Sequence, residues 1–149
     1  MVFFLSAQSA YAGTLTITET TAALCISGGG TILLRMSDTT NAHAELPDGT
    51  AYTANVVCGN GVTGLSNVVT APSAVILRLA GATNAHTEQN SQVNAAYTSN
   101  AYISVPTGGT VSVGYAAGVT CASLGYDATL ASMKSLTNSH VGNAAGVGR

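Results

Sequence analysis

The chain contains the stretch Leu33-Leu34-Arg35-Met36, which is followed by Thr40-Asn41-Ala42-His43-Ala44-Glu45. The same pattern returns with identical internal spacing as Ile76-Leu77-Arg78-Leu79 and Thr83-Asn84-Ala85-His86-Thr87-Glu88. A third copy reads Leu130-Ala131-Ser132-Met133 and Thr137-Asn138-Ser139-His140. Self-similarity at fixed spacing is typical of a repeat architecture, so these three stretches predict a fold built from repeated units.

Two of the copies continue into the pattern Tyr-Thr-x-Asn, at Tyr52–Asn55 and at Tyr97–Asn100. The third copy stops at Arg149, before this pattern is reached. We therefore expect a repeat-built β domain over residues 13–149. Its units would span about residues 24–66, 67–116 and 117–149, and the last unit would be incomplete.

Each unit is composed of short segments that are aliphatic, β-branched or aromatic, separated by glycine-rich turns. No window has helical periodicity over the ~10–12 residues that a helix usually needs. The sequence thus predicts an all-β protein, an antiparallel β-sandwich or barrel-like arrangement built from internal repeats. The expected strands are Thr31–Ser37, Tyr52–Cys58, Ala74–Ala80, Ala96–Val105, Thr110–Tyr115 and Thr129–Ser135.

The Thr-Asn-x-His motif is expected to be the bend of a hairpin. Pairing about Thr40 places Arg35 opposite Glu45, and pairing about Thr83 places Arg78 opposite Glu88. Opposite charges directly across a strand pair contribute about 0.2–1 kcal/mol. The third copy has Ser132 and Gly142 at these positions, so both partners are absent together, as a pairwise contact predicts.

Each bend contains an asparagine, which tolerates a left-handed backbone and bonds its own main chain. These asparagines are Asn41, Asn84 and Asn138.

All three histidines of the chain occupy the same place in the motif, at His43, His86 and His140. Imidazole is the commonest metal ligand, so a three-histidine metal site would follow if the side chains met. Equivalent positions in successive units normally lie a unit apart, however, which is far beyond the ~2 Å bond that each ligand needs. We therefore expect one histidine per turn, bonded to a carbonyl or the neighbouring threonine, with no metal site and no cofactor.

Three cysteines leave one without a partner inside the chain. Cys25 precedes the first unit's aliphatic strand, Cys121 precedes that of the third unit, and Cys58 closes the first unit. The economical interpretation is a Cys25–Cys58 disulfide, with Cys121 unpaired or bonded to another molecule. A Cys25–Cys121 pair and three reduced thiols are the alternatives.

The N-terminal residues 1–12 include a short apolar patch and end in Ala10-Tyr11-Ala12, followed by Gly13. This ending is typical of a secretory signal peptide cleaved after Ala12. A buried first strand or a frayed N-terminus is the alternative. The signal-peptide interpretation predicts a secreted or cell-surface protein.

Composition excludes several classes of function. Of 149 residues, 46% are hydrophobic and 7% are charged, with a formal net charge of −2. Four basic residues spread along the chain cannot form a phosphate-neutralising patch, which argues against nucleic-acid binding. No apolar run approaches the ~18 residues of a transmembrane helix.

The sequence also lacks a Gly-x-Ser-x-Gly elbow, a phosphate-binding loop and an alternating-acid calcium loop, so we expect no enzymatic activity.

The motif Leu-Arg-x-(x)4-Thr-Asn-Ala-His-x-Glu resembles that of secreted bacterial β-rich repeat proteins, over most of residues 24–149. The resemblance implies an exported location and no particular activity. We expect a structural or adhesive surface protein, such as a subunit of an extracellular filament or layer, that associates with itself or a surface partner. The alternative is a ligand-binding module, for a metal through the histidines or for a glycan through tyrosine and amide side chains. Tyr97 and Tyr102 are the tyrosines that could stack on a sugar ring.

Overall fold

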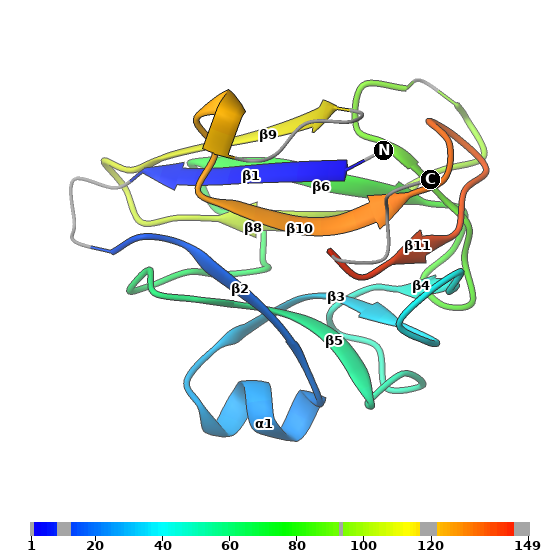
Figure 1. Ribbon diagram of the computed structural model, residues 1–149, viewed down its shortest axis with the longest axis horizontal. Helices are drawn as coiled ribbons and strands as arrows, with labels where there is room; N and C mark the ends of the chain where they lie inside the picture. Colours follow the sequence, from blue (N-terminus) through cyan, green and yellow to red (C-terminus); the bar gives the residue numbers. More distant parts are fainter. Residues whose placement is uncertain (1, 9–12, 93, 117–121, 145–149) are drawn as a thin grey trace.

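The structure, a computed structural model, describes residues 2–8, 13–92, 94–116 and 122–144. Antiparallel strands dominate it and form three sheets (Figure 1). Among the described residues the strands form no closed barrel. The predicted all-β class with antiparallel sheets is confirmed.

Each sheet combines strands from separate parts of the chain. The first sheet has the order β11-β10-β1-β9 and contains Val2–Gln8 (β1), Thr110–Ala116 (β9), Ala128–Met133 (β10) and Val141–Gly142 (β11). The second has the order β2-β5-β3-β4, with Thr16–Thr20 (β2), Thr31–Met36 (β3), Ala44–Glu45 (β4) and Asn55–Asn60 (β5). The third has the order β7-β6-β8, with Ser73–Leu79 (β6), Thr87–Gln89 (β7) and Ser99–Ser104 (β8).

The three sheets share one hydrophobic core. Leu34 of β3, Leu77 of β6 and Leu130 of β10 are all buried in it. Aliphatic side chains on strands of every sheet therefore pack together, and this common core fixes the sheets relative to one another.

The hairpin registers follow the expected spacing. Arg35 pairs with Glu45, Arg78 pairs with Glu88, and the third hairpin pairs Ser132 with Gly142. The three motif bends thus join β3 to β4, β6 to β7 and β10 to β11.

One short α-helix, Ala22–Ser27 (α1), was not predicted by the sequence pattern. Its six residues are too few to produce a periodic signal. The Thr21 side chain caps it by accepting a hydrogen bond from Leu24 N at 3.3 Å. A 3₁₀ turn, Ala122–Leu124 (η1), precedes β10.

A disulfide bond joins Cys25 of α1 to Cys58 of β5. The pairing favoured by the sequence is therefore confirmed. Both cysteines belong to a second, small core that contains Ile32 and Val56 and lies where α1 covers the second sheet (Figure 1). Cys121 lies outside the described residues.

Residues 2–8 form β1, which pairs with β9 on one side and with β10 on the other. A first strand was the alternative interpretation of this segment. The proposed cleavage point after Ala12 lies outside the described residues, so the signal peptide remains a prediction.

Candidate functional site

The three histidine-containing segments meet at one junction between the sheets. Three isolated β-bridges link them in pairs. Each bridge is made by residues that flank two different histidines, and its two backbone hydrogen bonds measure 2.8–3.0 Å. The bridges are Ala42–Val141, Ala44–Ala85 and Thr87–Ser139. We call this closed arrangement the bridge triangle.

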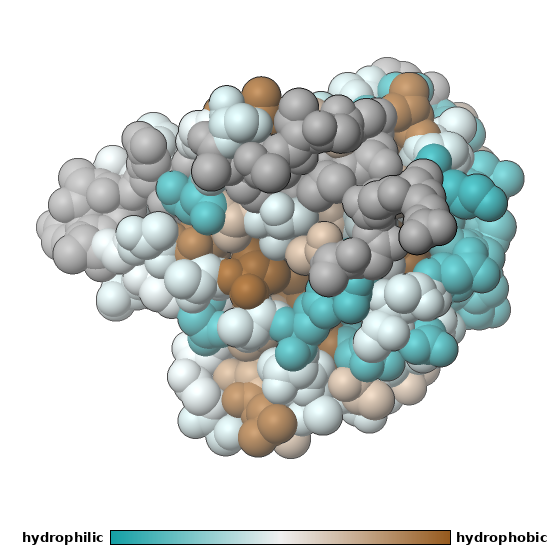
Figure 2. All heavy atoms as spheres, in the orientation of Figure 1, coloured by the Kyte–Doolittle hydropathy of each residue, from teal (hydrophilic) through white to brown (hydrophobic). Residues whose placement is uncertain are grey.

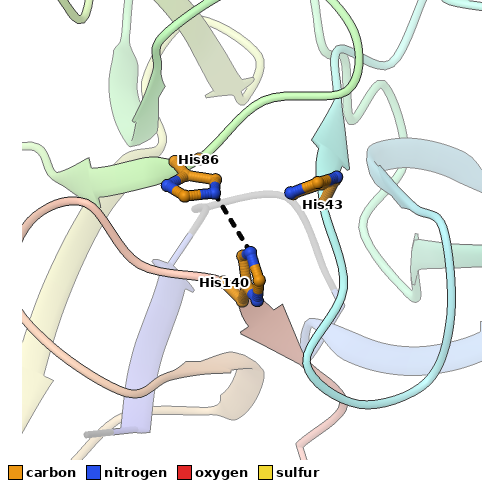
Figure 3. A group of neighbouring side chains, drawn as sticks. All are labelled: His43, His86 and His140. Atoms are coloured by element: carbon orange, nitrogen blue, oxygen red, sulfur yellow. Dashed lines mark hydrogen bonds between the residues drawn. The ribbon is translucent and has the colours of Figure 1, made fainter.

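The bridge triangle places the three imidazoles on the same side. Residues on either side of each histidine are buried, whereas the histidines are partly exposed. Successive side chains of an extended segment point to opposite faces. Because the flanking residues face the core, His43, His86 and His140 all point away from it and converge (Figure 3).

The convergence is close. One ring nitrogen from each histidine lies within 4.8 Å of those of the other two. The ring centroids of His43 are 5.1 Å from His86 and 4.7 Å from His140, and the remaining pair is 4.6 Å apart. Three nitrogens bound tetrahedrally at 2.0–2.1 Å from one ion would be roughly 3.4 Å apart, so small side-chain adjustments would let all three bind one ion.

The expectation that the histidines lie a unit apart is therefore wrong. It assumed that the units follow one another in a line. The bridge triangle instead brings residues next to each histidine into backbone contact with residues next to the other two.

Asparagines from the motif orient two of the imidazoles. All three motif asparagines have φ 49°, the left-handed conformation that their bends require. Asn138 Oδ1 lies 2.6 Å from His86 Nδ1, and Asn41 Oδ1 lies 2.7 Å from His140 Nδ1. Asn41 and Asn138 thus each contact the histidine of another motif copy.

These contacts define the tautomer of both rings. An amide oxygen only accepts hydrogen bonds, so Nδ1 of His86 and of His140 carries the proton and donates it. In the neutral ring, Nε2 then holds the lone pair. The two Nε2 atoms face each other at 3.1 Å (Figure 3). Two lone pairs at that separation repel unless a proton or a cation lies between them.

The electrostatic environment of the histidines disfavours a proton between the two Nε2 atoms. Burial lowers the pKa of His140, and the charges of His43, His86 and Lys134 lower it further. Neutral imidazoles are the form that binds metals. The cluster is thus suited to a metal cation near neutral pH.

Two tyrosines support the asparagines, and the sequence analysis did not include them in the site. Tyr52 Oη lies 3.2 Å from Asn84 Oδ1, and Tyr97 Oη lies 3.3 Å from Asn138 Oδ1. Their recurrence in the Tyr-Thr-x-Asn pattern was the available signal. Tyr97 is only 5% exposed, so its ring is not a platform for a sugar.

The arginine–glutamate pairs hold the loops that carry these tyrosines. Arg35 donates to Tyr52 O at 3.0 Å, and Glu45 accepts from Tyr52 N at 2.8 Å. Arg78 donates to Tyr97 O at 2.7 Å and forms an ion pair with Glu88 at 3.1 Å. The pairs therefore act on the histidines indirectly, through tyrosine and asparagine.

The environment of Glu45 favours its charged form. Burial acts to raise its pKa, but hydrogen bonds from the backbone of Tyr52 and Ala51, a hydrogen bond from the Thr83 side chain and the charge of Arg35 keep the pKa below its usual value. The carboxylate is thus held by its own loop and by a side chain of the second motif bend.

Comparison with known proteins adds no relative. No family model, curated protein or solved structure matches this chain.

Proposed function

We propose that this protein binds a divalent transition-metal ion, with Zn²⁺ as the first candidate, through His43, His86 and His140. The observation that carries the proposal is the 3.1 Å approach of two Nε2 atoms whose Nδ1 protons are directed at asparagine oxygens. A hydrogen-bonded Nδ1 is the usual arrangement of metal-binding histidines, because it fixes the ring and makes Nε2 more basic. Imidazole ligands suit zinc, copper and nickel.

The histidines supply the whole donor set of the cluster. Within the described part of the chain, the group of converging ligand atoms contains these three residues and no cysteine or carboxylate. Three neutral nitrogens match the protein ligands of known open zinc sites, in which the fourth position is taken by water or substrate.

The test is isothermal titration of the purified protein with Zn²⁺ and Co²⁺. We expect one ion per chain, and we expect His86→Ala to weaken binding at least ~100-fold because it removes one of three ligands. Asp48→Asn is the matched control, since it removes an exposed acidic group outside the cluster and should leave the affinity unchanged. Equal affinities for the wild-type protein and His86→Ala would contradict the proposal.

A second proposal concerns location and assembly. The Cys25–Cys58 disulfide supports an oxidising compartment. Within the described residues, none of the helices combines the length and apolar character needed to cross a membrane. We propose that the protein is secreted or held at the cell surface.

Self-association of the exported protein is supported by apolar side chains on α1. Leu24 is 64% exposed and Ile26 is 66% exposed, and Figure 2 shows an apolar patch over this helix. Low net charge also favours association. The patch would suit a structural or adhesive protein that forms contacts with copies of itself.

We expect the apparent mass of the wild-type protein to rise with concentration in light scattering. The double variant Leu24→Gln/Ile26→Gln should stay monomeric over the same range, because the apolar contact is lost. Leu124→Gln on η1 is the control, as it changes another exposed leucine away from α1. A wild-type protein that remains monomeric throughout would contradict self-association through this patch.

A further inference from the structure

The bridge triangle follows a cyclic rule. In every bridge, the residue after the histidine of one motif copy pairs with the residue before the histidine of the next copy, and the third copy pairs back to the first. The pairs, in this order, are Ala44–Ala85, Thr87–Ser139 and Val141–Ala42. The backbone of the junction therefore has approximate threefold symmetry.

The asparagine contacts obey the same rule. Asn138 of the third copy contacts His86 of the second copy, and Asn41 of the first copy contacts His140 of the third. In both contacts, the asparagine approaches the histidine of the preceding copy in the cycle. The rule therefore predicts one more contact, between the second and first copies.

The residues of this remaining contact are Asn84 and His43. The Ala44–Ala85 bridge joins their immediate neighbours in the sequence. Asn84 has the same φ of 49° as the other two motif asparagines, and its Oδ1 lies 3.2 Å from Tyr52 Oη. The asparagine of the third copy has a tyrosine at 3.3 Å in the same way. The supports of that asparagine are therefore repeated at Asn84.

The threonines beside these asparagines extend the symmetry. Thr137 Oγ1 donates to Glu88 Oε2 at 3.1 Å, and the side chain of Thr83 donates to Glu45. Each threonine thus bonds the glutamate of the preceding copy. The bends of the second and third copies are therefore anchored in the same way.

The ring of His43 departs from this symmetry. Within the described residues, the asparagine contacts that form are those to His86 and His140. The ring planes of these two histidines are 85° apart, and that of His43 lies 83° from His140 but 34° from His86. Threefold symmetry requires equal angles, so at least one ring must turn. His43 is the ring that an asparagine does not hold.

We infer, on the basis of the metal binding proposed above, that His43 binds the ion through Nε2 and donates its Nδ1 proton to Asn84 Oδ1. The His43 ring turns toward Asn84 as the ion binds, and the three imidazoles then share one tautomer. An amide oxygen has two lone pairs, so Asn84 keeps Tyr52 as its other donor. The new bond fixes the ring and makes Nε2 more basic. Asn84 is thus a positioning residue that acts on the ion through His43.

The test compares Asn84→Gly with the matched variant Asn138→Gly in the full chain. Glycine adopts the left-handed backbone readily, so each variant removes an amide without straining its bend. We expect each to weaken Zn²⁺ and Co²⁺ binding about 10-fold in isothermal titration, at the lower end of the effect of an outer hydrogen-bond partner. Asn84→Asp keeps an acceptor oxygen and should bind no more weakly than the wild-type protein.

Proton NMR of the Co²⁺-loaded protein separates this role from a structural one, because cobalt shifts the imidazole N–H protons of its ligands out of the crowded spectrum. We expect one shifted, solvent-exchangeable signal for each histidine of the wild-type protein. One of these signals should exchange faster in Asn84→Gly and a different one in Asn138→Gly. Asn84→Asp should retain the wild-type pattern.

The N–H signals decide the outcome. If they are the same in Asn84→Gly as in the wild-type protein, the inference is overturned and the metal site stands. This holds even where the affinity falls, since that fall would then come from the bend alone. Failure of the wild-type protein to bind either ion overturns the metal site itself, and the role of Asn84 with it.

Discussion

Replacing Arg78 with methionine is expected to lower the free energy of unfolding by about 3–5 kcal/mol, the cost of leaving one member of a buried ion pair alone. Glu88 is fully buried and lies 3.1 Å from the Arg78 guanidinium. Without arginine, the carboxylate keeps the Thr137 hydroxyl as a hydrogen-bond donor but loses its opposite charge. The loop hydrogen bonds to Asn94 O and Tyr97 O are lost as well. Urea unfolding measures the change.

The equivalent variant in the first hairpin is the matched control for Arg78→Met. Arg35→Met should cost less, because Glu45 keeps two backbone donors, at 3.1 Å from Ala51 N and 2.8 Å from Tyr52 N. Adding Glu88→Gln to Arg78→Met should recover part of the loss, since no unpaired charge then remains buried. If the two arginine variants are equally stable, the buried charge of Glu88 is not the cause.

Replacing Cys25 and Cys58 together with alanine is expected to cost about 3–4 kcal/mol. The disulfide closes a loop with a sequence separation of 33 residues, and in the chain-entropy model a loop of this size restricts the unfolded chain by that amount. Chemical unfolding with and without dithiothreitol measures the effect. The reductant should destabilise the wild-type protein to the same extent and leave the double variant unchanged. An oxidised protein no more stable than the reduced one would contradict this expectation.

Local pattern was sufficient to predict the hairpins. The distance of Arg35 and Glu45 from Thr40 determines their register, because strand pairing around a bend follows from counting residues. The left-handed bend at Asn41 and the Cys25–Cys58 bond also follow from features repeated along the sequence. The sequence pattern did not predict helix α1, because its six residues are too few to show helical periodicity.

The meeting of the histidines could not be predicted from the same information. It depends on the Ala42–Val141, Ala44–Ala85 and Thr87–Ser139 bridges, which join different sheets. Spacing within a motif carries no information about how copies of the motif pack against each other. The buried small residues beside each histidine were the available clue, but their meaning depends on three-dimensional packing.

The bridge triangle also has a kinetic consequence. Its Ala42–Val141 bridge and the neighbouring bond between Asn41 and His140 both join residues that lie 99 positions apart in the sequence. Non-local contacts must overcome the entropy of closing long loops, so they form late and slow the folding reaction. A half-folded chain would lack the converged imidazoles, so the proposed metal ion would bind after folding and would not direct it. Uptake of the proposed metal would then mark the end of folding, because the three imidazoles converge only in the native structure.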